Sequence, residues 1–161
     1  MPPITALLHT KNDALRLGRA LETLLPCAEL LIVDHQSSDA TVRVALEYGA
    51  RIMMANVQSG TEHYLSYPRH DWILCLDPSE SITEGLEATL LEWSSLPNAS
   101  PADAHAFSMF VRQAVAGKWR RGPAPETRLI PLNWTGWNGR FPSHEPSATA
   151  LEGELLRIDF P

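Results

Sequence analysis

WILCLDPSE, at positions 72–80, places five apolar residues directly before an acidic turn that contains a proline. An unbroken apolar run of this length, bounded by turn residues, predicts a strand that is buried on both faces. Such strands belong mostly to parallel sheets, whose ligands bind at the carboxyl ends of the strands. Asp77, Ser79 and Glu80 would lie at such an end. The same residues also suit a turn followed by a helix cap, so this stretch alone leaves both interpretations open.

The composition is that of one globular domain. The 161 residues suffice for a sizeable core, and the hydrophobic fraction of 44% and charged fraction of 20% are ordinary. The net charge of −6 argues against a general nucleic-acid-binding protein, which needs a basic face. An acidic chain can instead use a divalent cation to bridge its carboxylates to a phosphorylated ligand.

The cysteines and the apolar segments bear on the compartment. Cys27 and Cys75 lack the spacing of metal ligands and are interpreted as buried thiols in a reducing cytoplasm. No apolar run approaches the roughly 18 residues of a membrane span, and no signal peptide opens the chain. We therefore expect a cytoplasmic protein, and the sequence leaves open a peripheral contact with the inner face of the membrane.

Strands and helices are expected to alternate through the first hundred residues. Continuous apolar runs predict the strands, and apolar residues at helical spacing predict the helices between them. Asn12 or Asp13 is the expected cap of the first helix, and Pro26 ends it. The expected strands cover residues 4–10, 30–33, 51–54 and 72–76. The apolar residues of the first expected helix run from 15 to 25, and the other expected helices cover about 40–48, 62–67 and 82–93. This order predicts a parallel sheet with right-handed crossovers.

The pattern changes after Pro101, where proline, glycine and tryptophan concentrate. We expect strands over residues 104–115, 127–132 and 155–160, a turn at 116–118 and a turn-rich hairpin over 134–140. This half therefore predicts a loop-rich cap rather than another repeated strand–helix unit.

Three of the expected parallel strands end in polar residues, at 10–13, 34–39 and 77–80. In a parallel sheet these ends meet along one edge, where ligands bind. An acidic side chain there can accept hydrogen bonds from a ribose or a base, and paired carboxylates can hold Mg²⁺ or Mn²⁺ against a diphosphate. Neither GxGxxG nor GxxxxGK[ST] follows the first strand, which argues against a Rossmann dehydrogenase and a P-loop NTPase.

The same three stretches resemble motifs of the family 2 glycosyltransferases. ITALLHTKND at 4–13, LLIVDHQSSDAT at 30–41 and WILCLDPSE at 72–80 are similar to the first strand, the Val-Asp-x-x-Ser-x-Asp-x-Thr signature and the Leu-Asp-Ala-Asp-Glu strand of that family. The nearest likeness is to the lipopolysaccharide-core branch, whose Gly-Lys turn, Arg-Leu strand and His-Glu pair correspond to 117–118, 128–130 and 144–145. The resemblance covers Ile4 to about Glu145.

The resemblance implies a GT-A-like fold, a three-layer α/β/α arrangement with a mostly parallel central sheet that binds a nucleotide-diphospho-sugar. Four residues would line the nucleotide pocket, with the last of them on the base or ribose: Thr10, Asn12, Asp13 and Asp34. Arg128 would balance diphosphate charge, with a solvated strand residue as the alternative. Asp77 would act near the sugar diphosphate and its metal.

The downstream residues would supply the acceptor chemistry. Glu145 is the expected general base, which deprotonates an acceptor hydroxyl for an inverting, in-line displacement, and Glu126 is the second choice. His144 is either a metal ligand or a hydrogen-bonded structural histidine.

The metal motif departs from the family. Its Asp-x-Asp becomes Asp77-Pro78-Ser79, and a hydroxyl is a poorer ligand for a hard dication than a carboxylate. Glu80 is the expected substitute, so the predicted ligand set for weakly held Mg²⁺ or Mn²⁺ comprises Asp77, Ser79, Glu80 and His144.

Three functions remain open at this level. The first is an active glycosyltransferase that uses a nucleotide-sugar donor and a saccharide or lipid-linked acceptor, in the synthesis of lipopolysaccharide or another cell-envelope polysaccharide. The second is a catalytically weak or inactive domain that binds a nucleotide or a protein partner. The third, a nucleotidyltransferase, is disfavoured because its usual Gly-rich basic loop is missing. We expect one domain over 1–161, with a nucleotide-binding part at 1–100 and an acceptor-side part at 101–161, and the sequence leaves the oligomeric state open.

Overall fold

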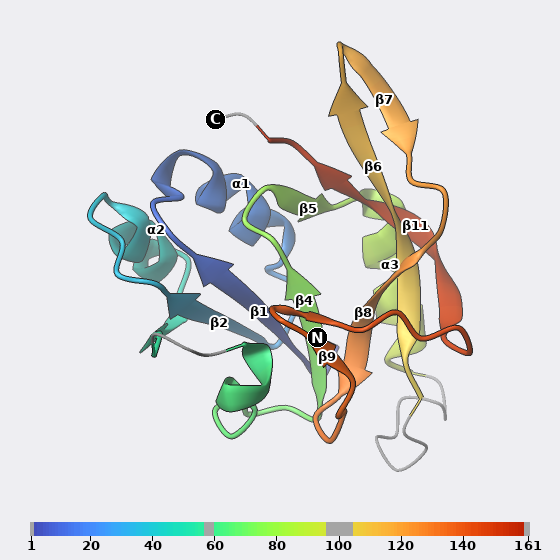
Figure 1. Cartoon of the computed structure of the whole chain (residues 1–161), viewed down its shortest axis with the longest axis horizontal. Helices are drawn as coiled ribbons and strands as arrows, with labels where there is room; N and C mark the ends of the chain where they lie inside the picture. Colours follow the sequence, from blue (N-terminus) through green and yellow to red (C-terminus); the bar gives the residue numbers. More distant parts are fainter. Residues whose placement is uncertain (1, 57–59, 96–104, 160–161) are drawn as a thin grey trace.

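The computed structural model describes residues 2–56, 60–95 and 105–159. A large mixed β-sheet forms its centre (Figure 1). The strands of this sheet are β1 (Ile4–Thr10), β2 (Glu29–Asp34), β3 (Arg51–Met54), β4 (Trp72–Leu76), β5 (Glu80–Ile82), β6 (Phe107–Val115), β7 (Lys118–Arg121), β8 (Glu126–Pro131) and β11 (Thr149–Arg157). The remaining elements are the helices α1 (Ala14–Thr23), α2 (Thr41–Glu47), η1 (Thr61–Tyr64) and α3 (Glu84–Trp93), and a small sheet of β9 (Trp137–Asn138) and β10 (Phe141–Pro142).

The strand order is β3-β2-β1-β4-β8-β6-β11-β5, with β7 paired to β6. The pairings give β1, β2, β3, β4, β6 and β11 one direction, while β5, β7 and β8 run the opposite way. The central sheet is therefore mostly parallel, as predicted. All seven residues of β1 are buried, which explains why its sequence is continuously apolar or uncharged.

The two faces of the sheet are covered differently. All three α-helices contribute to the same core cluster, through residues such as Leu17, Ala45 and Leu86. The cluster on the other face is closed by η1, through Tyr64, and by the β9–β10 sheet, through Phe141. The second outer layer thus contains a single 3₁₀ turn and a short hairpin among the described residues, rather than packed α-helices.

The helix predicted from about Ile82 to Trp93 is present as α3, but it begins at Glu84. Residues 80–82 form β5, because they pair with β11 far along the chain, with Glu80 opposite Arg157 and Ile82 opposite Leu155. Thr83 then caps α3 by accepting a hydrogen bond from the Leu86 amide at 3.3 Å.

The second half of the chain also differs from its predicted boundaries. β6 begins at Phe107, and Lys118 opens the strand β7 instead of only closing a turn. The last strand covers Thr149–Arg157 instead of 155–160, and the predicted strand ends at 104 and 160 lie outside the described residues. The turn between β6 and β7 contains Ala116 and Gly117, both with positive φ, of 50° and 77°.

Candidate functional site

The loops that follow β1 and β2 are joined by hydrogen bonds around Asp34. Its Oδ1 accepts from the Thr10 hydroxyl at 2.7 Å and from the Ser37 hydroxyl at 2.6 Å, and its Oδ2 accepts from the Ser37 amide at 3.0 Å. Burial alone would raise the pKa of Asp34, but the hydrogen bonds from Ser37 and Thr10 outweigh it and lower that pKa. Asp34 is fully buried, so it holds the two loops together as an ionised group.

Asn12 and Asp13 extend this junction. The Asn12 amide donates to the Ser37 hydroxyl at 2.9 Å, and the Asn12 carbonyl oxygen of the side chain accepts from the Ser38 amide at 2.8 Å. Asp13 stands at the N-cap of α1 without a side-chain cap bond, and its carboxylate accepts instead from the Lys11 amide at 2.8 Å. The four predicted nucleotide-binding residues are therefore brought together, but three of them are buried and only Asn12 is exposed.

Backbone strain marks the same two loops. Asn12 and Gln36 both adopt the left-handed region, with φ of 53° and 59°. Such conformations in non-glycine residues are uncommon and concentrate at functional sites, where the surrounding bonds hold them in place. The exposed side chains of this edge are Lys11, Asn12, Gln36, Ser38 and Asp39.

Asp77 closes the turn that follows β4. Its Oδ2 accepts from the Ser79 amide at 3.0 Å and from the Ser79 hydroxyl at 2.6 Å. The Asp77 amide donates to Glu80 Oε1 at 2.8 Å. Asp77 is half-buried, and its Oδ1 accepts no hydrogen bond from the part of the chain that the structure describes. One carboxylate oxygen of Asp77 is therefore open, in the sense that no described residue bonds to it.

Glu80 and Arg128 form a buried ion pair instead of facing a ligand. Arg128 donates to both Glu80 oxygens, at 2.6 and 2.8 Å, and Arg157 donates to Glu80 at 2.8 Å. Burial would raise the pKa of Glu80, but the hydrogen bonds and charge of Arg128 lower it; burial likewise opposes the charge of Arg128, whose pKa Glu80 raises. The two residues are 0% and 1% exposed, so Glu80 has a structural role and Arg128 is not a solvated strand residue.

A pocket of about 470 Å³ adjoins this ion pair. Glu126, Arg128 and His144 line it, and Phe141 packs in it with the Arg128 guanidinium 4.2 Å from its ring centroid. Glu126 is half exposed and binds Arg128 at 2.9 Å. Because Leu74 pairs with Leu129 in antiparallel β4 and β8, the start of β8 lies beside the end of β4. The pocket thus opens at the same edge of the sheet as Asp77.

Glu145 follows β10, and hydrogen bonds hold both its backbone and its carboxylate in place. Its amide donates to the Thr127 hydroxyl at 3.0 Å, and its carboxylate accepts from the Ser147 hydroxyl at 2.7 Å and the Ser147 amide at 3.1 Å. The Ser147 hydrogen bonds lower the pKa of Glu145, so this carboxylate is ionised near neutral pH. It is partly exposed, as a general base that must reach an acceptor has to be.

The four predicted metal ligands are not gathered into one group. No cluster of three or more His, Cys, Asp or Glu side chains suited to a cation occurs among the described residues. Glu80 is occupied by two arginines, and Ser79 donates its hydroxyl to Asp77. What fits a cation here is the open oxygen of Asp77, which corresponds to the single protein carboxylate that Mg²⁺ often uses together with substrate phosphates.

A histidine pair beside this edge was not predicted. His9 Nδ1 lies 2.7 Å from His35 Nε2, and His9 Nε2 lies 2.8 Å from the Thr61 hydroxyl. Thr61 donates its hydroxyl proton to the Arg140 carbonyl at 2.8 Å, so it must accept from His9 Nε2. His9 Nδ1 then accepts from His35, and each of the two histidines carries its proton on Nε2. The pKa of His9 is lowered to about 3. Burial is the largest cause, and the electrostatic effects of Arg140 and His35 add to it. Both histidines lie in the quoted motifs, but nothing in the sequence indicated their link to Thr61.

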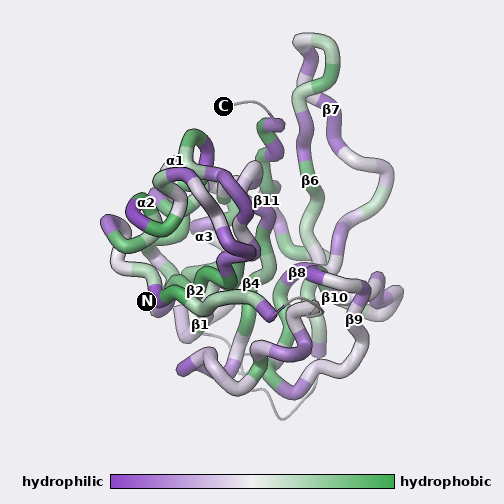
Figure 2. Tube along the Cα trace, turned by 60° about the vertical axis from the view of Figure 1, so that its left-hand side comes forward, coloured by the Kyte–Doolittle hydropathy of each residue, from purple (hydrophilic) through white to green (hydrophobic). Residues whose placement is uncertain are grey.

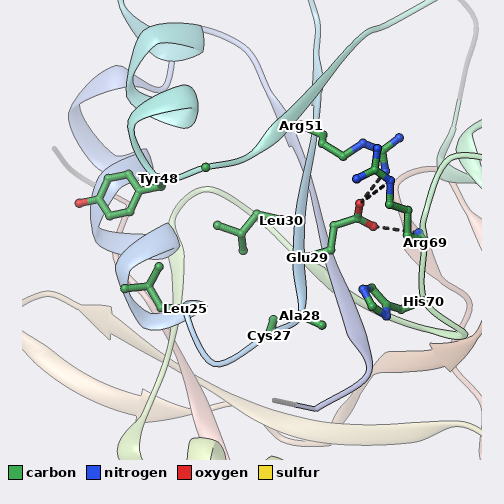
Figure 3. Close-up of a pocket in the computed structure, with 10 residues that line it drawn as sticks. Leu25, Cys27, Ala28, Glu29, Leu30, Tyr48, Arg51, Arg69 and His70 are labelled. Atoms are coloured by element: carbon green, nitrogen blue, oxygen red, sulfur yellow. Dashed lines mark hydrogen bonds and ion pairs between the residues drawn. The ribbon is translucent and has the colours of Figure 1, made fainter.

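Another hollow, of about 350 Å³, lies at the opposite edge of the sheet (Figure 3). It is lined where β2 and β3 begin, and Figure 3 shows Arg51 and Arg69 directed toward the carboxylate of Glu29. Arg51 binds Glu29 at 2.5 Å, and Thr5 donates to it at 2.8 Å. None of the predicted site residues lines this hollow, and its central carboxylate is satisfied by the protein itself.

Comparisons with solved structures match the fold. The crystal structure of TarS from Staphylococcus aureus with UDP-GlcNAc aligns with a TM-score of 0.56 over 71% of this chain and 36% of TarS, at 16% identity. The chain therefore has the GT-A glycosyltransferase fold. Glucosyl-3-phosphoglycerate synthase from Mycobacterium tuberculosis, crystallised with Mn²⁺ and UDP, aligns with a TM-score of 0.51 over 68% of this chain and 44% of the synthase, at 16% identity.

Comparisons with curated sequences point to glycosyltransferases as well. A protein of Rickettsia felis is 32% identical over 94 residues, covering 54% of this chain and 32% of that protein. A protein of Rickettsia bellii is 30% identical over 95 residues, covering 52% of this chain and 30% of that protein. Both are named uncharacterized glycosyltransferases, and the chain spans about a third of their length. No protein-family profile matches the chain.

Proposed function

We propose that this chain carries the donor-binding core of a glycosyltransferase. It would transfer a sugar from a nucleotide-diphospho-sugar to an acceptor hydroxyl with inversion at the anomeric carbon. The observation that supports this most is the open Oδ1 of Asp77, which stands at the carboxyl edge of a GT-A sheet. Strand ends of this kind are where α/β sheets bind their ligands.

The donor would lie across this edge. The exposed side chains of Lys11 and Asn12 would contact the nucleotide, while buried Thr10, Asp13 and Asp34 keep the loop shape that receives it. Arg128 would not bind the diphosphate, because its guanidinium is already paired with Glu80 and Glu126; it would position the start of β8 beside the donor instead.

The acceptor would enter from the pocket beside Arg128. Glu145 would remove the proton of the acceptor hydroxyl. The acceptor oxygen would form the new bond to the anomeric carbon while the bond from that carbon to the diphosphate breaks. The nucleoside diphosphate leaves with the electron pair. Glu126 is the second candidate for the base, although Arg128 and Arg157 already bind it, at 2.9 and 3.5 Å.

A divalent cation would neutralise the charge of the leaving diphosphate when bound. Asp77 is the residue that would hold it, together with the donor phosphates. His144 would bind the cation only in the complex with the donor, because it belongs to no preformed metal site among the described residues. Cation binding is therefore expected to require the nucleotide.

The first test is ligand-induced stabilisation. UDP or GDP with Mn²⁺ is expected to raise the melting temperature, because a ligand that binds only the folded state stabilises it by mass action. Absence of any shift across a panel of nucleoside diphosphates, with and without metal, would refute the binding of a nucleotide.

The second test separates transfer from binding. Glu145→Gln is expected to lower hydrolysis of the donor sugar by about a hundredfold to ten-thousandfold, the range of a lost acid–base group. Asp77→Ala is expected to lower it as well, because the variant loses the carboxylate proposed to hold the cation. Asp71→Ala and Glu92→Gln are the matched controls, since Asp71 is an exposed acid before the opposite end of β4 and Glu92 is an exposed glutamate of α3. Equal rates in Asp77→Ala and Asp71→Ala would show that the site has been placed wrongly.

A domain that binds the nucleotide without transferring sugar is the alternative, and Ser79 is the observation that favours it. Replacing Ser79 by aspartate restores the second carboxylate of the family motif. If Ser79→Asp raises both Mn²⁺ affinity and turnover, the natural site is a weakened enzyme. If it raises affinity without turnover, the binding domain is the better description. The place in lipopolysaccharide or envelope synthesis stays a prediction, as does the division of the chain at residue 100.

A further inference from the structure

The hairpin of β6 and β7 projects from the body of the molecule. Both views show its tip clear of the helices and of the rest of the sheet (Figures 1 and 2). All four residues of β7 are exposed. We refer to residues 112–121, the outer part of this hairpin, as the basic hairpin.

The basic hairpin concentrates positive charge in an acidic chain. It contains Arg112, Lys118, Arg120 and Arg121, and no acidic residue occurs between positions 105 and 125. The rest of the chain has nine basic and nineteen acidic residues, a net charge of −10. This separation of charge is larger than the overall charge of −6 suggests, and it gives one end of the molecule a sign opposite to that of the remainder.

The four cations of the basic hairpin differ in their pairing. Arg112 and Arg121 lie opposite each other in the hairpin and share Glu154, at 3.1 and 3.3 Å. Lys118 and Arg120 have no acidic partner in the part of the chain that the structure describes. Since alternate residues of a strand share a face, Lys118 and Arg120 project from the same side of β7.

Apolar side chains accompany these two cations at the tip. Val115 and Trp119 are 46% and 47% exposed, although burial would stabilise both of them. Val115 is paired with Lys118, so an apolar and a cationic side chain stand next to each other at the end of the hairpin. Tryptophan beside basic residues is the composition that proteins place at the boundary between lipid headgroups and acyl chains.

We propose that the basic hairpin docks this protein on the surface of an anionic phospholipid bilayer. The hairpin enters tip first: Lys118 and Arg120 bind lipid phosphates from one face of β7, with Val115 beside Lys118 on that face. Trp119 projects from the other face of β7 and enters the headgroup boundary from that side. A nucleic acid fits less well, because it has no place for Val115 and its long anionic backbone would meet the acidic remainder of the chain.

Docking through the basic hairpin would also bring the acceptor pocket close to the bilayer surface. Gly122 and Pro123, which follow the basic hairpin directly, line the pocket that contains Glu126 and His144. A lipid-linked acceptor would then reach the pocket from the membrane; this clause rests on the proposed transfer function, whereas the docking itself does not.

The test is co-sedimentation with lipid vesicles, which requires no donor sugar and no turnover. We expect binding to vesicles with about a third phosphatidylglycerol, no binding to phosphatidylcholine alone, and a decrease with salt. Lys118→Gln with Arg120→Gln is expected to weaken binding about 25-fold, since each basic residue near an anionic surface contributes about fivefold. Arg43→Gln, an exposed arginine on α2, is the matched control and should leave binding unchanged.

A second variant tests the apolar contact. Trp119→Ala is expected to weaken vesicle binding severalfold, while Leu15→Ala, at a side chain that is 80% exposed elsewhere, should have no effect. The melting temperature of each variant checks that it is folded. Equal binding to both kinds of vesicle, or an unchanged affinity of the double variant, overturns the proposal. Equally tight binding of a double-stranded RNA at the same salt concentration would also overturn it, in favour of a polyanion site.

Discussion

Mild acid should destabilise this protein through His9. Its ring accepts a hydrogen bond from His35 and donates one to Thr61, so both nitrogens are used in the neutral form. A second proton on the ring would have to displace the His35 bond, in a place that is only 4% exposed. The folded state therefore holds His9 neutral under conditions in which the unfolded chain protonates it.

The magnitude follows from proton linkage. The pKa of His9 is lowered from 6.5 to about 3, so between these values the unfolded state binds a proton that the folded state does not. Stability is then present above the unfolded pKa and is lost as the pH falls below it. Between pH 7 and pH 5 this loss amounts to about 2 kcal/mol. Glu29, Asp34 and Glu80, whose pKa values are also lowered, add their losses mainly below pH 5.

Urea unfolding at pH 7 and pH 5 measures the difference. His9→Gln should be less stable than the wild type at pH 7 but should lose about 2 kcal/mol less on acidification. His63→Gln, at a side chain that is 58% exposed, should retain the full pH dependence. An unchanged pH dependence in His9→Gln would show that His9 is not the group that couples folding to pH. If that variant does not fold, NMR titration of the wild type decides the matter, since the His9 ring must not titrate between pH 7 and pH 5.

Three further outcomes are expected, for a buried ion pair, a tightly packed glycine and a buried thiol. Glu80→Gln leaves Arg128 charged and partly unpaired in a buried place, and should lower the free energy of unfolding by about 3–5 kcal/mol in denaturant titrations. Gly153→Ala should lower the melting temperature far more than Gly117→Ala, because an added Cβ at 153 would stand 2.3 Å from the Leu86 amide while position 117 is open; similar shifts would contradict the close contact between α3 and β11. The Cys75 thiol, whose pKa burial raises to about 12, should react with iodoacetamide only after unfolding, and rapid native alkylation would disprove its burial.

The sequence predicts best those elements whose residues determine their own conformation. Residues 72–76 are apolar and buried throughout, and β4 forms where the pattern places it. β5 has only three residues, and nothing local distinguishes 80–82 from the start of a helix. Its conformation is fixed by pairing with β11, which is separated from it by most of the second half of the chain. Contacts of that range are not encoded in periodicity.

The candidate site could be predicted only as a set of neighbours. The strand-end motifs located Asp34, Asp77 and Glu80 at one edge, as the topology has them. The sequence did not reveal which of these carboxylates remain open. Glu80 follows the metal motif and was therefore predicted as a cation ligand, but its partner Arg157 lies 77 positions away and occupies it. The exposed fraction of a carboxylate thus depends on distant strands that the motif does not contain.

Ser79 stabilises the turn that contains it. Both its amide and its hydroxyl donate to Asp77 Oδ2, so the turn is ordered by the protein's own donors. A carboxylate at position 79 would lack the hydroxyl donor and would add a like charge beside Asp77, which a bound cation would have to offset. With serine, Asp77 is held in place before any ligand arrives. Under the proposed function, the counter-charge for the donor diphosphate would come with the donor, as a cation bound jointly by its phosphates and the single open oxygen of Asp77. Mn²⁺ is therefore expected to bind only together with a nucleoside diphosphate, and Mn²⁺ binding to the protein alone at the same concentration would contradict this account.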